Sequence, residues 1–95
     1  MRLSDQVLSQ IKRSFEEVFA EGSLYLFGSR VDDNARGGDI DLFIETCDEK
    51  DLFVRKIKFL ARIKRVLGEQ RVDVVFSRDA SELLRREIRK WAIRL

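Results

Sequence analysis

The sequence predicts an α/β domain in which a small mixed β-sheet of about three strands is packed by three helices. Three long segments repeat apolar residues every three or four positions, which is the period of an amphipathic helix. Three short segments rich in β-branched and aromatic residues have the length of strands. Glycines such as Gly22 and Gly68 stand between segments, where turns are expected. The predicted order along the chain is helix, strand, strand, helix, strand, helix.

Residues 4–21 are expected to form the first helix. Ser4 is a suitable N-cap because its hydroxyl can accept a hydrogen bond from the first turn, where the negative charge of Asp5 is also favourable. Gly22 is expected to end this helix. Its apolar stripe comprises Val7, Leu8, Ile11, Phe15, Val18 and Phe19.

Residues 23–27 and 39–45 are expected to be the first two strands, joined by the loop 28–38 as an antiparallel pair. The first strand is almost continuously apolar, so Tyr25 is expected in the core. Side chains alternate between the two faces of a strand. In the second strand this places Ile40, Leu42 and Ile44 on one face and Asp39, Asp41 and Phe43 on the other.

Residues 49–68 are expected to form the second helix, which Gly68 ends. Apolar residues cover much of its circumference. We expect its main apolar face to comprise Phe53, Ile57, Leu60, Ala61 and Leu67, with Phe59, Ile63 and Val66 broadening that face.

Residues 71–76 are expected to be the third strand and residues 79–94 the third helix. Because a long helix separates the second and third strands, these two are expected to pair in parallel. Asp79 followed by Glu82 fits a capping box with Asp79 at the N-cap. The apolar face of the third helix comprises Leu83, Leu84, Ile88, Trp91, Ala92 and Leu95, with Trp91 expected in the core and the arginines on a solvated face.

The composition limits the class of protein. A length of 95 residues suits one domain, residues 1–95, and a net charge of +2 does not favour nucleic acid as an electrostatic partner. No apolar stretch approaches the ~18 residues of a membrane span, and the start lacks the apolar region of a signal peptide. The single cysteine, Cys47, fits a reducing compartment, so we expect a cytoplasmic protein in which Cys47 is a small buried apolar residue.

The chain has no histidine, which excludes histidine-dependent catalytic and zinc sites and leaves carboxylates, Lys, Arg, Ser, Tyr and one Cys for chemistry. Asp39 and Asp41 project from the same face of a strand, and Asp73 joins them if its strand is adjacent. Three crowded carboxylates repel one another unless a cation lies among them, and carboxylates favour Mg²⁺ or Mn²⁺. The sequence therefore predicts a pair of divalent ions of the kind that serves nucleotidyl transfer.

A phosphate-binding segment is predicted beside these acids. Gly28 lets phosphates approach the backbone, and the Ser29 hydroxyl can donate a hydrogen bond to them. Arg30 and Arg36 are candidates for neutralising phosphate charge. Each feature alone has a structural explanation: an exposed polar strand face, a Gly-Ser turn, and an Asp73 paired with an arginine. Their order along the chain, a Gly-Ser turn after a strand, then Asp-x-Asp on a second strand and Asp73 on a third, favours a nucleotide site.

The motif Gly28-Ser29, followed by Asp39-Ile40-Asp41-Leu42, resembles the signature of the polymerase-β-like nucleotidyltransferase superfamily. Asp73 resembles its third catalytic acid, and the Gly-Ser-Arg opening resembles the minimal nucleotidyltransferases of prokaryotes. The resemblance implies a nucleotidyltransferase-like fold and ATP as substrate. It also implies Asp39 and Asp41 as ligands of both Mg²⁺ ions, Asp73 as a further ligand of one, and Gly28 and Ser29 as phosphate contacts.

The resemblance also implies a partner. Minimal nucleotidyltransferases are commonly paired with HEPN-domain proteins, and in several pairs the small protein is an antitoxin that transfers AMP from ATP to a tyrosine of a HEPN toxin. Two alternatives remain open: a non-catalytic antitoxin that acts by occlusion, and a small-molecule adenylyltransferase, which the short chain disfavours. The sequence leaves open the nucleotide preference, the acceptor residue, the number of groups transferred and whether the chain forms a homo-oligomer.

Overall fold

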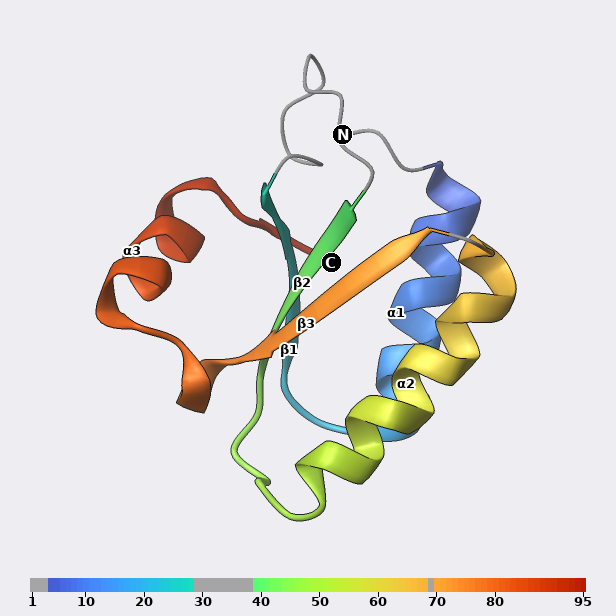
Figure 1. The fold of residues 1–95 in the computed structure, drawn as a ribbon, viewed down its shortest axis with the longest axis horizontal. Coiled ribbons are helices and arrows are strands. Elements are labelled where there is room, and N and C mark those ends of the chain that lie inside the picture. Colours follow the sequence, from blue (N-terminus) through green and yellow to red (C-terminus); the bar gives the residue numbers. More distant parts are fainter. Residues whose placement is uncertain (1–3, 29–38, 69) are drawn as a thin grey trace.

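The structure is a computed structural model that describes residues 4–28, 39–68 and 70–95. The α/β class and the mixed sheet are confirmed, but the sheet has four strands among the described residues rather than about three (Figure 1). The elements in chain order are α1 (Asp5–Phe19), β1 (Ser23–Phe27), β2 (Asp39–Glu45), α2 (Leu52–Leu67), β3 (Arg71–Phe76), the 3₁₀ helix η2 (Ser77–Asp79), α3 (Glu82–Trp91) and β4 (Ile93–Arg94).

The strand order is β3-β2-β1-β4. As predicted, β1 pairs with β2 antiparallel and β2 pairs with β3 in parallel through the crossover helix α2. The bounds of the first three strands agree with the sequence prediction. β4 pairs antiparallel with β1, with Leu26 opposite Ile93.

The prediction of one helix over residues 79–94 was wrong at both ends. The N-cap of α3 is Ser81, whose Oγ accepts a hydrogen bond of 3.1 Å from the Leu84 N–H, and Asp79 belongs to η2. At the other end, the Leu95 N–H donates to the Leu24 carbonyl at 2.8 Å. The edge of β1 offers unpaired backbone groups, so the chain end leaves the helix and pairs with that edge.

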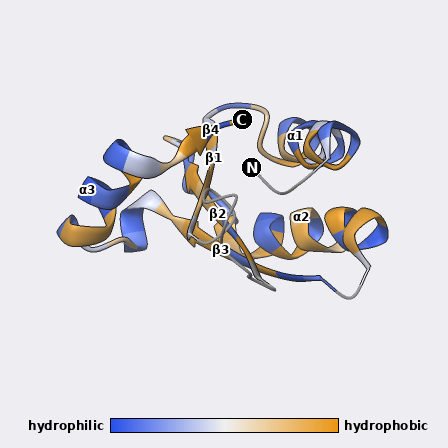
Figure 2. Ribbon diagram, turned by 90° about the horizontal axis from the view of Figure 1, so that it is seen from above, coloured by the Kyte–Doolittle hydropathy of each residue, from blue (hydrophilic) through white to orange (hydrophobic). Residues whose placement is uncertain are grey.

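Three layers build the domain: α1 and α2 on one face of the sheet, the sheet itself, and α3 on the other face (Figure 2). The core lies between the sheet and the helix pair. Phe19 packs against Phe15, Phe59 and Phe76 with ring centroids 5.3 to 6.0 Å apart. The buried sheet residues of this core are Leu24, Leu26, Ile40, Leu42, Ile44, Val74 and Phe76.

The buried face of α2 is shifted relative to the sequence prediction, although Leu60 and Leu67 of the predicted face do pack against the core. Phe59 and Ile63 are fully buried, whereas Phe53 is 74% exposed and Ile57 is 50% exposed. The helix carries apolar residues on two faces, so its periodicity alone does not decide between them. Contact with the phenylalanines of α1 selects the face that contains Phe59.

Three single-residue predictions also need correction. Trp91, expected in the core, is 65% exposed at the C-terminal end of α3, whose buried residue is Ile88. Cys47, expected to be buried, is exposed in the segment that follows β2. Tyr25 is only half-buried because it lies on the face of β1 opposite Leu24 and Leu26.

Glu21 joins the end of α1 to the segment after β2. Its Oε1 accepts hydrogen bonds from the Thr46 hydroxyl and from the backbone N–H groups of Cys47 and Asp48, the last two at 3.2 Å. The hydrogen bond from Thr46, followed by the one from Asp48, lowers the pKa of the Glu21 carboxyl below its ordinary value of 4.5.

Replacing Glu21 by glutamine is therefore expected to lower the unfolding temperature at neutral pH. A carboxyl whose pKa is lowered by folding stabilises the folded state above its ordinary pKa, and this contribution is lost as the pH falls through the folded pKa. Thermal unfolding of both proteins between neutral and acidic pH should give curves that converge at low pH. A difference that is constant across the pH range would contradict the assignment.

Candidate active site

Two of the predicted acids lie side by side on neighbouring strands. Asp41 of β2 and Asp73 of β3 are register partners in the parallel pair, so their side chains project from the same face of the sheet. Adjacent strands lie about 4.8 Å apart, which allows the two carboxylates to share one ion. Asp41 is half-buried and Asp73 is exposed, so the pair is accessible from solvent.

The face that carries these acids is the one covered in part by α3. The sheet residues that form the main core alternate with Asp41 and Asp73, and they point toward α1 and α2. Asp39 lies two residues before Asp41 in β2, opposite Arg71 of β3, at a position that belongs to the acid-bearing face.

Several predicted site residues lie outside the described residues: Ser29, Arg30, Arg36 and the side chain of Asp39. Among the side chains that the structure describes, no group of three acids or cysteines is placed to hold a metal ion. The two predicted acids whose side chains are described are therefore Asp41 and Asp73. For the third acid, Asp39, only the backbone position in β2 is described.

Gly28 directly follows β1 and lies against the carboxylate of Asp41. Its neighbour Phe27 is the register partner of Asp41. A Cβ atom at Gly28 would collide with Oδ2 of Asp41 and would lie 3.1 Å from its Cγ. Gly28 also has a φ of +79°, which side-chain-bearing residues rarely adopt. Glycine is therefore needed here both for the turn and for the space that the Asp41 carboxylate fills.

The donor set suits a hard divalent cation. Carboxylate oxygens are the ligands that Mg²⁺ prefers in proteins, and two of them come together from separate strands at Asp41 and Asp73. The bare Cα of Gly28 leaves the Asp41 carboxylate in place at the end of β1. The residues present therefore fit the divalent metal that the sequence predicts.

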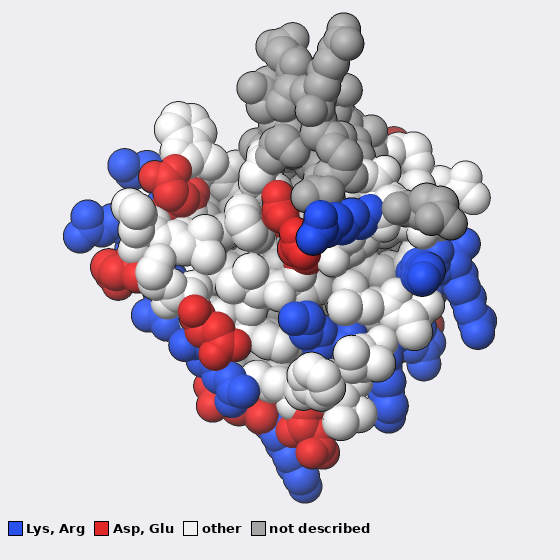
Figure 3. Space-filling model, in the orientation of Figure 1, with Lys and Arg blue, Asp and Glu red and all other residues white. Residues whose placement is uncertain are grey.

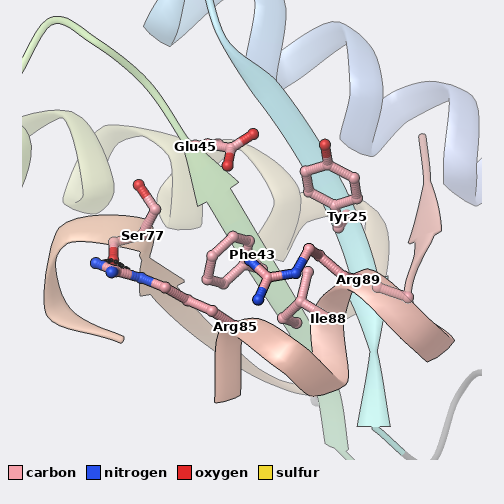
Figure 4. A pocket seen from close by; sticks show the side chains of 8 residues that line it. Tyr25, Phe43, Glu45, Ser77, Arg85, Ile88 and Arg89 are labelled. Carbon is pink, nitrogen blue, oxygen red and sulfur yellow. Dashed lines mark hydrogen bonds between the residues drawn. The ribbon is translucent and has the colours of Figure 1, made fainter. Parts of the chain in front are cut away.

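A cavity of about 330 Å³ lies on the same sheet face, between the sheet and α3 (Figure 4). Tyr25 and Phe43, register partners on β1 and β2, form part of its wall with ring centroids 6.1 Å apart. Arg85 is held in place because its guanidinium donates to the Ser77 carbonyl at 2.7 Å. The lining residues are Tyr25, Phe43, Glu45, Ser77, Arg85, Ile88, Arg89 and Ala92.

The cavity is not evident from the sequence, because Tyr25 belongs to an almost continuously apolar strand and was therefore expected in the core. The strand alternation that separates Asp41 from Leu42 also places Phe43 on the acid-bearing face, one row further along the sheet. Applied to the first strand, the same alternation would have separated Tyr25 from Leu24 and Leu26. The covering helix α3 could not be placed from the sequence, because its side of the sheet depends on the path of the chain after β3.

No helix among the described residues is long and apolar enough to cross a membrane. A sequence model of the family described as "Polymerase beta, Nucleotidyltransferase" matches residues 9–95. No curated protein is similar enough in sequence to match.

Solved structures share the fold. A crystal structure of a Tyr-to-Ala mutant of the toxin-antitoxin pair MntA-HpeT has a TM-score of 0.72 and 22% identity, over 93% of this chain and 69% of that chain. A mutant of the same pair with two Asp-to-Glu substitutions has a TM-score of 0.73 and 21% identity, over 90% of this chain and 69% of that chain. A protein described as a candidate minimal nucleotidyltransferase has a TM-score of 0.74 and 23% identity, over 96% of this chain and 94% of that chain.

Proposed function

We propose, since this chain belongs to the polymerase beta nucleotidyltransferase family, that it is an antitoxin that transfers AMP from ATP to a tyrosine of a HEPN-domain toxin. The observation that carries the proposal is the register of the sheet, which sets Asp41 beside Asp73 with Gly28 against the Asp41 carboxylate. The similarity in fold to a toxin-antitoxin structure supports the partner class. The proposed location is the cytoplasm, where ATP is available.

In this proposal Asp39, Asp41 and Asp73 hold two Mg²⁺ ions, with Mn²⁺ as a substitute. When bound, the ions neutralise the charge of the triphosphate and of the leaving pyrophosphate. The backbone of Gly28 at the end of β1 contacts the phosphates, and its neighbour Ser29 donates a hydrogen bond to them. Arg30 and Arg36 supply positive charge from the adjoining segment.

The acceptor hydroxyl comes from another molecule. The oxygen of the acceptor tyrosine attacks the α-phosphorus of ATP, and the bond from that phosphorus to pyrophosphate breaks. Asp73 is exposed on the edge strand β3, so a hydroxyl on a partner protein can reach it, and its carboxylate can accept the proton. The cavity beside Phe43 lies on the sheet face that carries the acids, and in this proposal it binds the adenine ring.

A transfer assay tests the proposal. The purified chain is incubated with α-labelled ATP, Mg²⁺ and the proposed partner, a HEPN-domain protein encoded by a neighbouring gene, and label is expected on a tyrosine of that protein. The Asp39→Ala/Asp41→Ala double variant and an EDTA-treated sample should transfer none. If the wild type labels no more than the double variant, the enzymatic proposal is wrong.

The same variant separates modification from occlusion. Toxin activity is measured after incubation with wild-type chain or with the Asp39→Ala/Asp41→Ala variant, each with ATP. Neutralisation is expected with the wild type alone. Equal neutralisation by both proteins would favour a non-catalytic antitoxin, and label found on an aminoglycoside instead of a protein would favour a small-molecule enzyme.

A further inference from the structure

The outward side of α2 carries an apolar ridge that the core does not use. Phe53 is 74% exposed, and Val54 and Ile57 are each 50% exposed. Ala61, also exposed, continues the row, because residues four apart lie along one side of a helix. These four residues, Phe53, Val54, Ile57 and Ala61, are called the α2 ridge below.

Positive charge is concentrated on the same helix. The sequence of α2, LFVRKIKFLARIKRVL, contains six basic residues and no acidic one, although the net charge of the whole chain is only +2. Figure 3 shows blue Lys and Arg side chains around white ones at the lower right, where α2 lies. The basic residues are Arg55, Lys56, Lys58, Arg62, Lys64 and Arg65.

Two of these basic side chains already have structural partners. Arg62 forms a 2.5 Å ion pair with Glu17 of α1, and Arg55 lies 3.9 Å from the Asp48 carboxylate. Both are on the side of α2 that faces the rest of the domain. Lys58 and Arg65, which lie on the outward side with the ridge, form no ion pair with another described residue.

We propose that the α2 ridge, flanked by Lys58 and Arg65, is a docking surface for an acidic amphipathic helix of a partner protein. The apolar side of such a helix would cover Phe53 and Ile57, and its carboxylates would lie beside the two basic side chains. Recognition of this kind combines apolar anchors with charge complementarity. The exposure of Phe53 supports this proposal, because burying an exposed aromatic ring against a partner lowers the free energy of the complex.

The other occupants fit less well. A second copy joined by a two-fold axis would place the α2 ridge on itself and oppose like charges, which is unfavourable. Nucleic acid would leave Phe53 and Ile57 without an apolar partner. An anionic membrane would have to accept a ridge of only four apolar residues, far smaller than the apolar face of a membrane-surface helix.

This surface is distinct from the candidate active site. The α2 helix covers the sheet face opposite the one that carries Asp41 and Asp73 (Figure 2). Occupation of the α2 ridge would therefore leave the acids open to an acceptor. The inference does not depend on the proposed transfer reaction, and the Asp39→Ala/Asp41→Ala variant should dock the same partner as the wild type.

The test uses a defined probe, a fluorescein-labelled helical peptide of about 18 residues with leucine on one face and glutamate elsewhere. Fluorescence anisotropy with the full chain should show binding that weakens at high salt. The Phe53→Ser/Ile57→Ser variant should bind at least about tenfold more weakly, a loss of about 1.4 kcal/mol. The Lys58→Glu/Arg65→Glu variant should bind more weakly and with less dependence on salt.

Matched controls separate docking from unfolding and from other occupants. Leu83→Ser removes an apolar side chain of similar exposure, 69%, on α3 across the sheet, and should bind the peptide like the wild type. Circular dichroism checks that each variant is folded. The proposal is overturned if the wild type does not bind, or if Leu83→Ser weakens binding as much as the ridge variant. Ridge-dependent binding of phosphatidylserine vesicles in place of the peptide, or ridge-dependent dimerisation, would also overturn it.

Discussion

Replacing Asp73 by asparagine is expected to lower the rate of AMP transfer at least about a hundredfold, with little change in the unfolding temperature. Asp73 is exposed, so its replacement leaves the core untouched. Asp73 is the register partner of Asp41, and the neutral amide would remove one of the charges proposed to hold a divalent ion. The measurement is the initial rate of label transfer to the proposed HEPN partner at saturating ATP.

Asp79→Asn is the matched control for this variant. Asp79 is an exposed acid shortly after the same strand, and its carboxylate lies 3.8 Å from the guanidinium of Arg78 instead of near Asp41. Transfer by Asp79→Asn should equal that of the wild type. If Asp73→Asn retains full activity, Asp73 does not take part in the transfer reaction, and the site uses only the acids of β2.

Gly28→Ala is expected both to destabilise the domain and to remove most of the transfer activity. A positive φ costs a residue with a side chain about 1–2 kcal/mol relative to glycine. The new methyl group would also occupy the position of Oδ2 of Asp41, so the carboxylate must rotate away from the place where it lies beside Asp73. Chemical denaturation measures the loss of stability, and the transfer assay measures the loss of activity.

Gly68→Ala separates these two effects. Gly68, at the end of α2, has a φ of +65°, and a Cβ atom there would meet nothing within 4 Å. This variant should lose a similar amount of stability and keep the wild-type transfer rate. If both variants lose activity equally, backbone strain explains the loss, and the contact between Gly28 and Asp41 does not.

The family assignment and the structure bear on different parts of the reaction. Membership of the nucleotidyltransferase family gives the class of chemistry. The register of β2 and β3 shows how two acids 32 positions apart in the chain come to share one sheet face. The transfer assay tests the proposed partner and the acceptor tyrosine, and the neutralisation assay separates modification from occlusion.

The sequence predicted the strands better than the final helix. The first three strands are short segments rich in β-branched and aromatic residues: 23–27, 39–45 and 71–76. Their intrinsic preference for the strand conformation therefore agrees with the fold. The segment 79–94 has helical periodicity throughout. Its last residues are nevertheless a strand, because the free edge of β1 accepts them.

By itself the sequence determined the class of the fold, the pairing directions of the first three strands and the position of Asp39 and Asp41 on one strand face, because side-chain alternation and chain connectivity are local properties. Tertiary structure alone decided which face of α2 is buried, since that helix is apolar on two sides and the phenylalanines of α1 contact only one. It also decided that Gly28 lies against Asp41 and that α3 covers the acid-bearing face to form a cavity. These are contacts between segments distant in the chain, and no periodicity within either segment encodes them.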